Sequence, residues 1–229
     1  MGKQKGIKDT KISDLFEKEI GYIFNETLQD IVRDTLNNSP KCIGWIPASS
    51  SGKYHSKGDC YVGSIDDDGT IHAGGLVNHI RTVTAIAYSL MDSNAFKDIA
   101  LGTGKVDFET LQIYQDSAIA ACILHDCCKA KDEDEKHITC FDHPILAAKL
   151  FKETAKKYIT KDNMDYMKVV IPLIYGCIAS HMNKWNTSKY MPDVVLPIPK
   201  LGIEVFVSMC DFIGSRKFID MNFEVYDNE

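Results

Sequence analysis

An apolar segment that ends in an adjacent histidine and aspartate constrains the fold of this chain more than any other stretch. Residues 118–124 carry no charge, and His125 and Asp126 follow them directly. An uncharged apolar run of this kind predicts a buried helix. Buried polar groups need partners, because an unpaired one costs about 1–3 kcal/mol and an unpaired charge costs more. The two side chains therefore either cap a helix end and form a surface ion pair, or bind a metal ion that satisfies both at once.

Apolar residues recur at three- and four-residue steps over most of the chain, which predicts amphipathic helices. We expect these helices over about residues 13–36, 75–91, 108–126, 145–158, 163–182 and 201–218. The sequence pattern lacks the alternation of strands and helices that is typical of a parallel sheet. The sequence therefore predicts an all-α fold, a bundle of about six or more helices.

We expect a single domain over residues 1–229, which begins with a loose tail at 1–11 and an N-terminal helix within 12–38. A loop-rich segment at 41–74 follows, with a short strand pair near 61–65 and 70–73. Residues 75–218 form the helical core. Long loops in compact domains are often functional, although a flexible connection is the alternative here.

Charge, hydropathy and cysteine usage limit the classes of protein to which this chain can belong. A net charge of −6 argues against a general nucleic-acid coat, although a local basic patch remains compatible with it. No apolar run reaches the roughly 18–20 residues of a membrane span, so we expect no membrane partner. The eight cysteines contain no C-x-x-C pair, and the N-terminal residues lack the apolar core of a signal peptide. These features predict a cytoplasmic protein with reduced, buried thiols.

Four histidines and two aspartates lie at or near the predicted helices' ends or in their apolar faces. They are His79, His125, Asp126, His143, His181 and Asp211. A mixed set of nitrogen and oxygen donors suits Mn, Fe, Co, Ni or Zn. Six ligands exceed the needs of one tetrahedral ion, so two ions bridged by Asp126 are a natural arrangement. Asp211 has an alternative use, a salt bridge to Arg216 or a lysine.

The order of these residues resembles that of the HD-domain metal-dependent phosphohydrolases, an all-helical superfamily. The segment 124–129, Leu-His-Asp-Cys-Cys-Lys, is similar to the central motif of that family, L-H-D-x-x-K. Further similar segments are 74–79, 142–144, 180–182 and 210–216, and the block 47–55 is similar to one that precedes the first ligand in some members. The resemblance extends over residues 47–217.

The resemblance implies a role for each ligand. His79, His125, Asp126 and Asp211 would form the basic metal site, and His143 and His181 would complete a second one. Members with two metals often have paired histidines where this chain has His181 and Met182, which leaves the coordination of the second ion open. His55 then supplies either the missing imidazole or a contact to substrate.

The resemblance also implies phosphate-binding residues. Lys129 would face phosphate or act as a general acid through water, and its alternative is a solvated lysine at a helix end. Lys53, Arg81 and Arg216 are further candidates for phosphate contacts. Tyr54 and Trp185 are candidates for stacking on a base, with core packing as the alternative for Trp185.

The resemblance implies that the chain is a metal-dependent phosphohydrolase that cleaves a small nucleotide-type phosphoester. The two-metal set favours a phosphodiester, either a cyclic nucleotide or an RNA 3′ end, with Asp126 and Lys129 at the reaction centre. A one-metal site would favour nucleoside monophosphates. A module that binds a nucleotide or protein partner without cleaving it, and a helical scaffold with incidental histidines, are alternatives. A homo-oligomer is compatible with the sequence.

Overall fold

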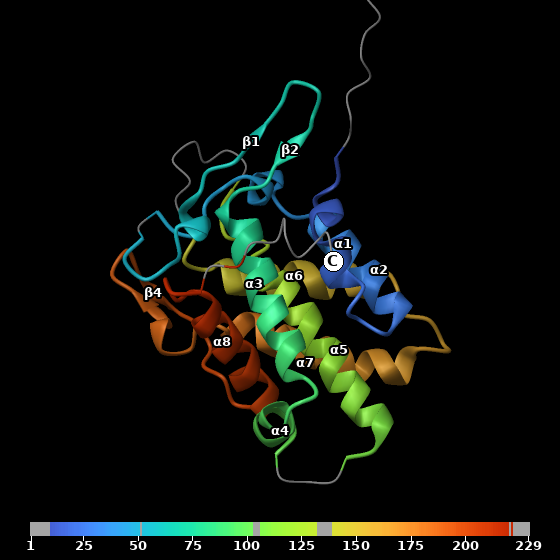
Figure 1. Ribbon diagram of the computed structural model, residues 1–229. Coiled ribbons are helices and arrows are strands. Elements are labelled where there is room, and N and C mark those ends of the chain that lie inside the picture. Colours follow the sequence, from blue (N-terminus) through green and yellow to red (C-terminus); the bar gives the residue numbers. More distant parts are fainter. Residues whose placement is uncertain (1–9, 51, 103–105, 132–138, 220, 222–229) are drawn as a thin grey trace, which may run out of the picture.

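Helix α5 (Phe108–Leu124) lies at the centre of the fold, as its uncharged sequence predicts (Figure 1). The structure is a computed structural model, and it describes residues 10–50, 52–102, 106–131, 139–219 and 221. Every residue of α5 from Asp116 to Leu124 is buried. A helix that is apolar on all sides must be surrounded by other helices.

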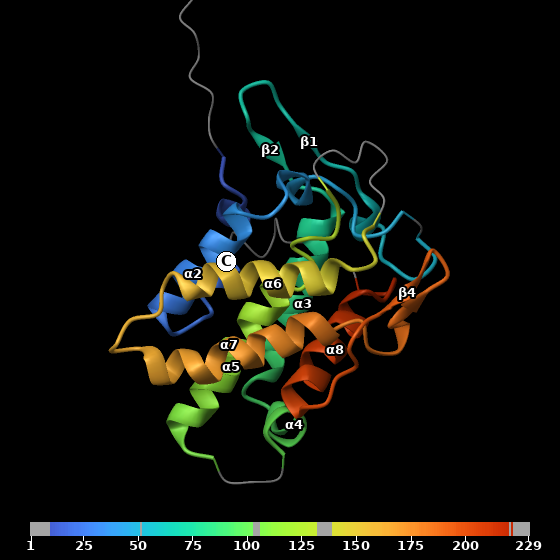
Figure 2. The same cartoon turned by 180° about the vertical axis from the view of Figure 1, so that it is seen from behind.

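Among the helices that the structure describes, four of the longer ones pack against α5. They are α2 (Glu26–Asn37), α3 (Gly75–Leu90), α7 (Met164–Ser180) and α8 (Gly202–Gly214). Helix α6 (His143–Lys156) packs beside α7 and also contacts α2 (Figure 2). A short helix α4 (Asn94–Phe96) and a π-helical turn (Lys97–Leu101) connect α3 to α5 and pack against α8.

Strands are few, so the prediction of an all-α fold is confirmed. The described residues form only two two-stranded antiparallel sheets, β1–β2 and β3–β4. Strands β1 (Ser64–Ile65) and β2 (Ile71–His72) form the predicted hairpin near residues 61–73, which projects from the body of the molecule (Figure 1). Strands β3 (Thr187–Ser188) and β4 (Met191–Val195) connect a 3-10 helix (Asn183–Trp185) to the segment before α8. No helix in the described parts of the chain is long and apolar enough to cross a membrane.

The prediction of one continuous N-terminal helix is wrong. The chain forms a 3-10 helix (Ile12–Phe16), a short α1 (Glu17–Ile20) and, after a break, α2. Asp116 of α5 causes the break, because its carboxylate accepts hydrogen bonds from the backbone N–H groups of Phe24 (2.8 Å) and Asn25 (3.0 Å). Asn25 then caps α2 through the N–H of Leu28. A tertiary contact therefore overrides the local helical pattern.

The segment before α3 lies directly on the first turn of that helix. It contains two 3-10 helices (Lys41–Gly44 and Gly58–Cys60), and its carbonyl groups accept hydrogen bonds from the N–H groups of Gly74, Gly75 and Leu76. A Cβ atom on Gly75 would lie 2.2 Å from the carbonyl oxygen of Asp59. Only glycine therefore allows this close approach.

Helix α8 ends at Gly214, four residues before the predicted end at Phe218. A Cβ atom on Gly214 would lie 2.8 Å from Cγ2 of Val83, so α8 approaches α3 closely at this point. Residues 1–9 of the predicted loose tail lie outside the described residues.

Candidate metal centre

The six predicted ligands meet in one place, which we call the floor cluster. His79 lies in the second turn of α3, His125 and Asp126 follow α5, and His143 begins α6. His181 follows α7, and Asp211 lies in the last turn of α8. All of them are buried except Asp211, whose side chain is 19% exposed. Asp211 Oδ1 lies 3.1 Å from His79 Nε2 and 3.8 Å from His125 Nε2, so its carboxylate points into the cluster.

Three of the histidines have their ring orientation fixed by the backbone. The Nδ1–H groups of His125, His143 and His181 donate to the carbonyl oxygens three residues earlier, at 2.8, 2.6 and 2.8 Å. A carbonyl oxygen only accepts hydrogen bonds, so each Nδ1 carries the hydrogen. The neutral form of each ring therefore has a bare lone pair on Nε2.

These Nε2 atoms face each other and the carboxylates at short range. His143 Nε2 lies 3.3 Å from His181 Nε2, and His125 Nε2 lies 3.3 Å from His79 Nε2. Asp126 Oδ1, which lies 2.9 Å from His143 Nε2, is buried and has no hydrogen-bond donor among the described residues. Lone pairs and negative charges that converge in a buried place repel each other, unless a cation lies between them.

The pKa values of the cluster agree with ligand chemistry. Burial lowers the pKa of His125, and it lowers the pKa of His181 to about 3, so both imidazoles are neutral near pH 7. Burial opposes ionisation of Asp126, but the charge of Lys129 and the interactions with His125 and His143 together outweigh it and hold the pKa of Asp126 well below its usual range. His79 differs, because the hydrogen bond and charge of Asp211 outweigh its burial and raise its pKa. Neutral imidazoles and ionised carboxylates are the forms that bind metal ions.

The two oxygens of Asp126 divide the cluster into two groups. Oδ2 lies 3.5 Å from His125 Nε2 and 3.7 Å from His79 Nε2, whereas Oδ1 lies 2.9 Å from His143 Nε2 and 3.7 Å from His181 Nε2. The first group, together with Asp211, offers two imidazoles and two carboxylates. The second offers two imidazoles and one carboxylate oxygen. This donor set fits divalent transition-metal ions, with Asp126 between the two positions.

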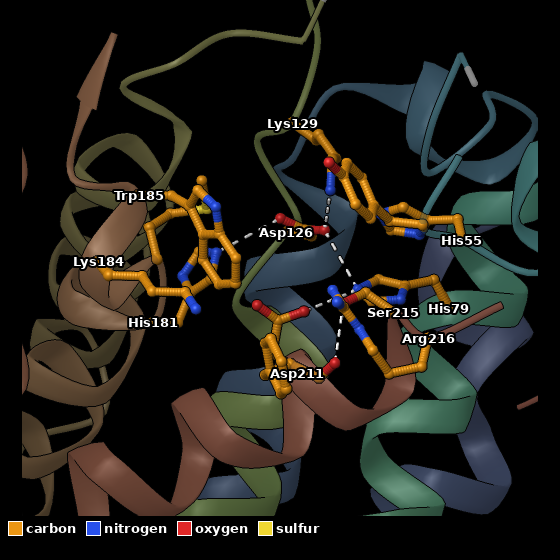
Figure 3. A pocket seen from close by; sticks show the side chains of 13 residues that line it. His55, His79, Asp126, Lys129, His181, Lys184, Trp185, Asp211, Ser215 and Arg216 are labelled. Atoms are coloured by element: carbon orange, nitrogen blue, oxygen red, sulfur yellow. Dashed lines mark hydrogen bonds and ion pairs between the residues drawn. The ribbon is translucent and has the colours of Figure 1, made fainter. Parts of the chain in front are cut away.

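Lys129 is not the solvated lysine of the alternative interpretation. Its side chain is only 13% exposed, and its Nζ donates to Asp126 Oδ2. It lies at the edge of the floor cluster and faces the pocket above it (Figure 3).

An open pocket with a volume of about 460 Å³ lies above the floor cluster (Figure 3). Its walls contain aromatic and cationic side chains, which we call the mouth: Tyr54, Lys184, Trp185, Phe212 and Arg216. The ring of Trp185 stacks on that of Phe212, with centroids 5.7 Å apart and planes at 20°. Trp185 is 45% exposed, so the alternative that it packs in the core is wrong.

Of the remaining residues that we expected to contact substrate, one lines the pocket and two do not. His55 lines the pocket beside His79, with ring centroids 5.6 Å apart, so it does not complete the group of His143 and His181. Arg81 pairs with the buried Glu19 at 2.9 Å, and Lys53 lies over the ring of Tyr54. Neither Arg81 nor Lys53 lines this pocket.

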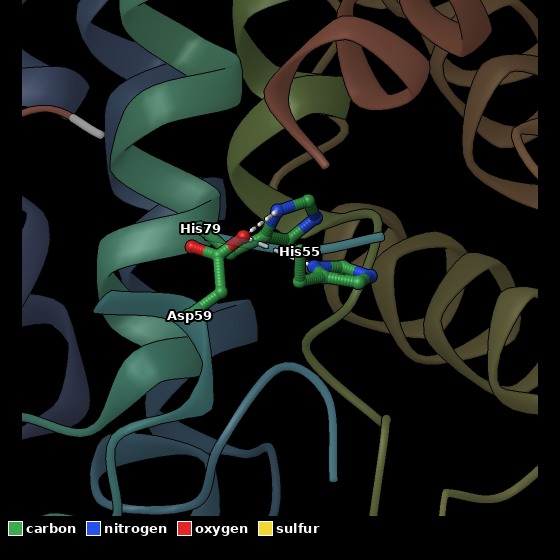
Figure 4. A group of neighbouring side chains, drawn as sticks. All are labelled: His55, Asp59 and His79. Carbon is green, nitrogen blue, oxygen red and sulfur yellow. Dashed lines mark hydrogen bonds and ion pairs between the residues drawn. The ribbon is translucent and has the colours of Figure 1, made fainter. Parts of the chain in front are cut away.

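Sequence reasoning missed Asp59. This residue is 1% exposed, and its Oδ2 accepts a hydrogen bond from His55 Nδ1 at 3.0 Å and lies 3.8 Å from His79 Nδ1 (Figure 4). An aspartate in a polar loop gives no periodic signal, so only the folded chain reveals its burial.

Comparisons of the chain with models of protein families, with curated proteins and with solved structures find no match. The geometry itself supports a coarser conclusion. This helical protein contains a buried cluster of histidines and aspartates that is compatible with a metal site of the HD type.

Proposed function

We propose that this chain is a metal-dependent phosphohydrolase that acts on a small nucleotide-type phosphoester. The observation that carries the proposal is the convergence of the bare Nε2 lone pairs of His125, His143 and His181 with carboxylate oxygens at the bottom of an open pocket. A purely structural polar cluster would pair each acceptor with a donor. Here the acceptors face each other, and the pocket gives a substrate access to them.

The histidines and aspartates of the floor cluster would hold divalent ions, which would supply Lewis acidity toward a phosphoryl group and would lower the pKa of a bound water molecule. The chain contributes the rest. Asp126 holds the two groups of ligands at a fixed separation through its two oxygens. Lys129 holds a proton and a positive charge beside Asp126 at the edge of the pocket, where the oxygens of a phosphoester would lie.

The charge and shape of the pocket support a small anionic substrate with a planar ring. Lys129, Lys184 and Arg216 bring three cations to the pocket of a chain whose net charge is −6. The exposed rings of Tyr54 and Trp185 offer faces for a base. The volume is within the range of about 300–1,000 Å³ that is typical of small-molecule sites. A phosphodiester such as a cyclic nucleotide, or the 3′ end of an RNA, is the substrate class that we favour.

The uneven donor sets favour a second candidate, a nucleoside monophosphatase with one ion. The group of His143 and His181 has only one carboxylate oxygen, and Met182 lines the pocket where HD-domain proteins with two metals often have another histidine. An ion that binds only the group of His79, His125 and Asp211 would leave the second position to solvent and substrate.

Metal analysis and turnover on a panel of substrates test the proposal. The purified protein is stripped of metal, reloaded with Mn, Fe, Co, Ni or Zn, and assayed on cyclic nucleotides, RNA 3′ ends and nucleoside monophosphates. The matched variants are Asp126→Asn and Asp165→Asn, the second of which changes an exposed aspartate of α7. We expect bound metal and turnover in the wild type and in Asp165→Asn, and neither in Asp126→Asn.

A wild-type protein that binds no transition metal, or an Asp126→Asn variant with full activity, would reject the proposal. Tight binding of a nucleotide that stays intact with every metal would instead favour a module that binds without cleaving. Release of phosphate from monophosphates alone, with one ion bound, would support the monophosphatase.

A further inference from the structure

One ligand histidine lacks the support that the other three receive. The Nδ1–H groups of His125 and His181 donate to carbonyls in the last turns of α5 and α7, where such carbonyls lack helical partners. The Nδ1–H of His143 donates to the carbonyl of Cys140, in the turn before α6. His79 lies inside α3, where the preceding carbonyls belong to the helix. Its Nδ1 is buried and has no hydrogen-bond partner among the described residues.

The carboxylate nearest to this atom is that of Asp59, from the segment before α3 (Figure 4). Asp59 Oδ2 lies 3.8 Å from His79 Nδ1, on the side of the ring away from the floor cluster, so a shift of less than 1 Å would make a hydrogen bond. His55 Nδ1 donates to the same oxygen at 3.0 Å, and Asn78 Nδ2 donates to Oδ1 at 3.1 Å. The carboxylate is therefore held in place from two sides, and one acceptor position faces His79.

The backbone fixes Asp59 relative to α3. Its carbonyl oxygen accepts the N–H of Ala48 at 2.8 Å, and its N–H donates to Ser56 Oγ at 3.2 Å. The same carbonyl lies against Gly75, where no side chain would fit. The position of Asp59 thus follows from the packing of the loop on the helix that carries His79.

We propose that Asp59 is a positioning residue for His79. It accepts the Nδ1–H of His79 when metal is bound, which directs Nε2 toward the group that contains His125 and Asp211. His55 and Asn78 hold the carboxylate. The inference rests on the metal site of the proposed function, but not on any reaction that occurs there. Histidine ligands of metals usually donate their second N–H to a carboxylate or carbonyl group, and loss of that partner typically costs about 10- to 100-fold in metal affinity.

Metal titrations of the full chain with Co²⁺ and Zn²⁺ test the proposal. In Asp59→Asn, one carboxylate oxygen becomes an NH₂ group, which only donates hydrogen bonds. The single oxygen that remains cannot accept from both His79 on the Oδ2 side and Asn78 on the Oδ1 side. We expect Asp59→Asn to bind one of two ions about 10- to 100-fold more weakly, with the affinity of the other unchanged within about threefold. The visible spectrum of the weakened Co²⁺ site should also change, because the imidazole of His79 is less well oriented.

The matched control is Asp66→Asn. Asp66 also accepts from a histidine, His72 Nε2 at 2.9 Å, but that pair is exposed on the β1–β2 hairpin. We expect wild-type metal affinity and spectrum in this variant. The melting temperatures of the metal-free proteins separate a loss of positioning from a loss of folding.

A measurement on the wild-type protein covers the case in which Asp59→Asn does not fold. Long-range ¹H–¹⁵N correlation spectra of the Zn²⁺-loaded protein report which ring nitrogen of His79 carries the hydrogen. We expect a hydrogen-bonded proton on Nδ1. A proton on Nε2, or none on either nitrogen, would overturn the proposal.

Equal metal affinity in Asp59→Asn and wild type would also overturn it, while leaving the proposed function intact if the wild type binds metal and turns over substrate. Complete loss of one ion in both Asp59→Asn and His55→Gln, with the other ions unaffected, would show instead that His55, Asp59 and His79 hold an ion themselves. A wild-type protein that binds no ion would overturn both the positioning role and the proposed function.

Discussion

The floor cluster and the mouth border the same pocket, but they are built differently. The floor cluster consists of buried side chains whose orientation comes from helices and backbone carbonyls. The mouth consists largely of exposed side chains, with Tyr54 at 56% exposure, on loops and at the end of α8. Rigid, buried ligands suit chemistry that needs fixed geometry, whereas exposed rings and cations can adapt to a substrate.

Contacts within the mouth are correspondingly weak. The guanidinium of Arg216 lies 4.1 Å from the ring centroid of Phe212 and 5.9 Å from that of Tyr54. Exposed cation–π contacts of this kind contribute about 0.5–1 kcal/mol each. Under the proposed function, the floor cluster would determine the metal and the reaction, and the mouth would determine which substrate binds.

The largest effect should come from Asp126, the residue shared by both ligand groups. We expect Asp126→Asn to lose both ions and about a thousandfold or more in kcat/KM, because metal ions contribute several kcal/mol to catalysis. Metal content by mass spectrometry and steady-state kinetics measure the two effects. An Asp126→Asn protein that keeps two ions would contradict the proposal that Asp126 is shared by both ligand groups of the floor cluster.

Removal of metal should have the next largest effect, on stability. An ion present at about a hundred times its Kd stabilises the folded state by about 2.7 kcal/mol. For a chain of this size, chelation should lower Tm by about 5–11 °C, at about 2–4 °C per kcal/mol. Thermal melts with and without chelator measure the shift. Trp185→Ala should show the same shift, and an unchanged Tm in the wild type would mean that no ion supports the floor cluster.

Substitution in the mouth should affect substrate binding alone. We expect Trp185→Ala to raise KM by about 5- to 150-fold, since stacking on a base contributes about 1–3 kcal/mol, while kcat and metal content stay near wild type. Trp185→Phe keeps a ring and should retain most of the affinity. A Trp185→Ala variant with lower kcat at unchanged KM would contradict the proposed division of roles.

The smallest effect should come from Lys184. Its Nζ lies 4.6 Å from the ring centroid of Trp185, on an exposed part of the mouth. We expect Lys184→Ala to raise KM by about two- to fivefold, and this increase should disappear at high salt because exposed charges are screened. Kinetics at two ionic strengths measure it. Lys168, an exposed lysine of α7 paired with Asp165, offers the control Lys168→Ala, which should have no effect at either ionic strength.

The sequence predicted the floor cluster far better than the mouth. Its ligands lie at helix starts and ends that periodicity and capping residues reveal, and the resemblance to the HD-domain proteins supplied their grouping. The mouth depends on how a loop before α3 meets the end of α8, which no local pattern encodes. Arg81 shows the same difficulty, because its buried partner Glu19 belongs to a helix more than sixty residues earlier.

Two further misses have the same physical origin. Residues 13–36 have a continuous helical period, yet two hydrogen bonds to Asp116 interrupt the helix. Asp59 looks like any loop aspartate until the chain packs it against His79. In both cases a buried carboxylate acts on a segment that is distant in sequence, and the spacing of apolar residues carries no information about that contact.

The close fit between Gly75 and the backbone of Asp59 has a consequence for protein engineering. The preceding segment caps the first N–H groups of α3, so this helix has no clean domain boundary at its beginning. A shortened chain that starts at residue 75 would contain every floor ligand, but would begin with uncapped N–H groups and an unsupported His79. Any transplant of this centre into another scaffold must therefore carry residues 41–74 with it.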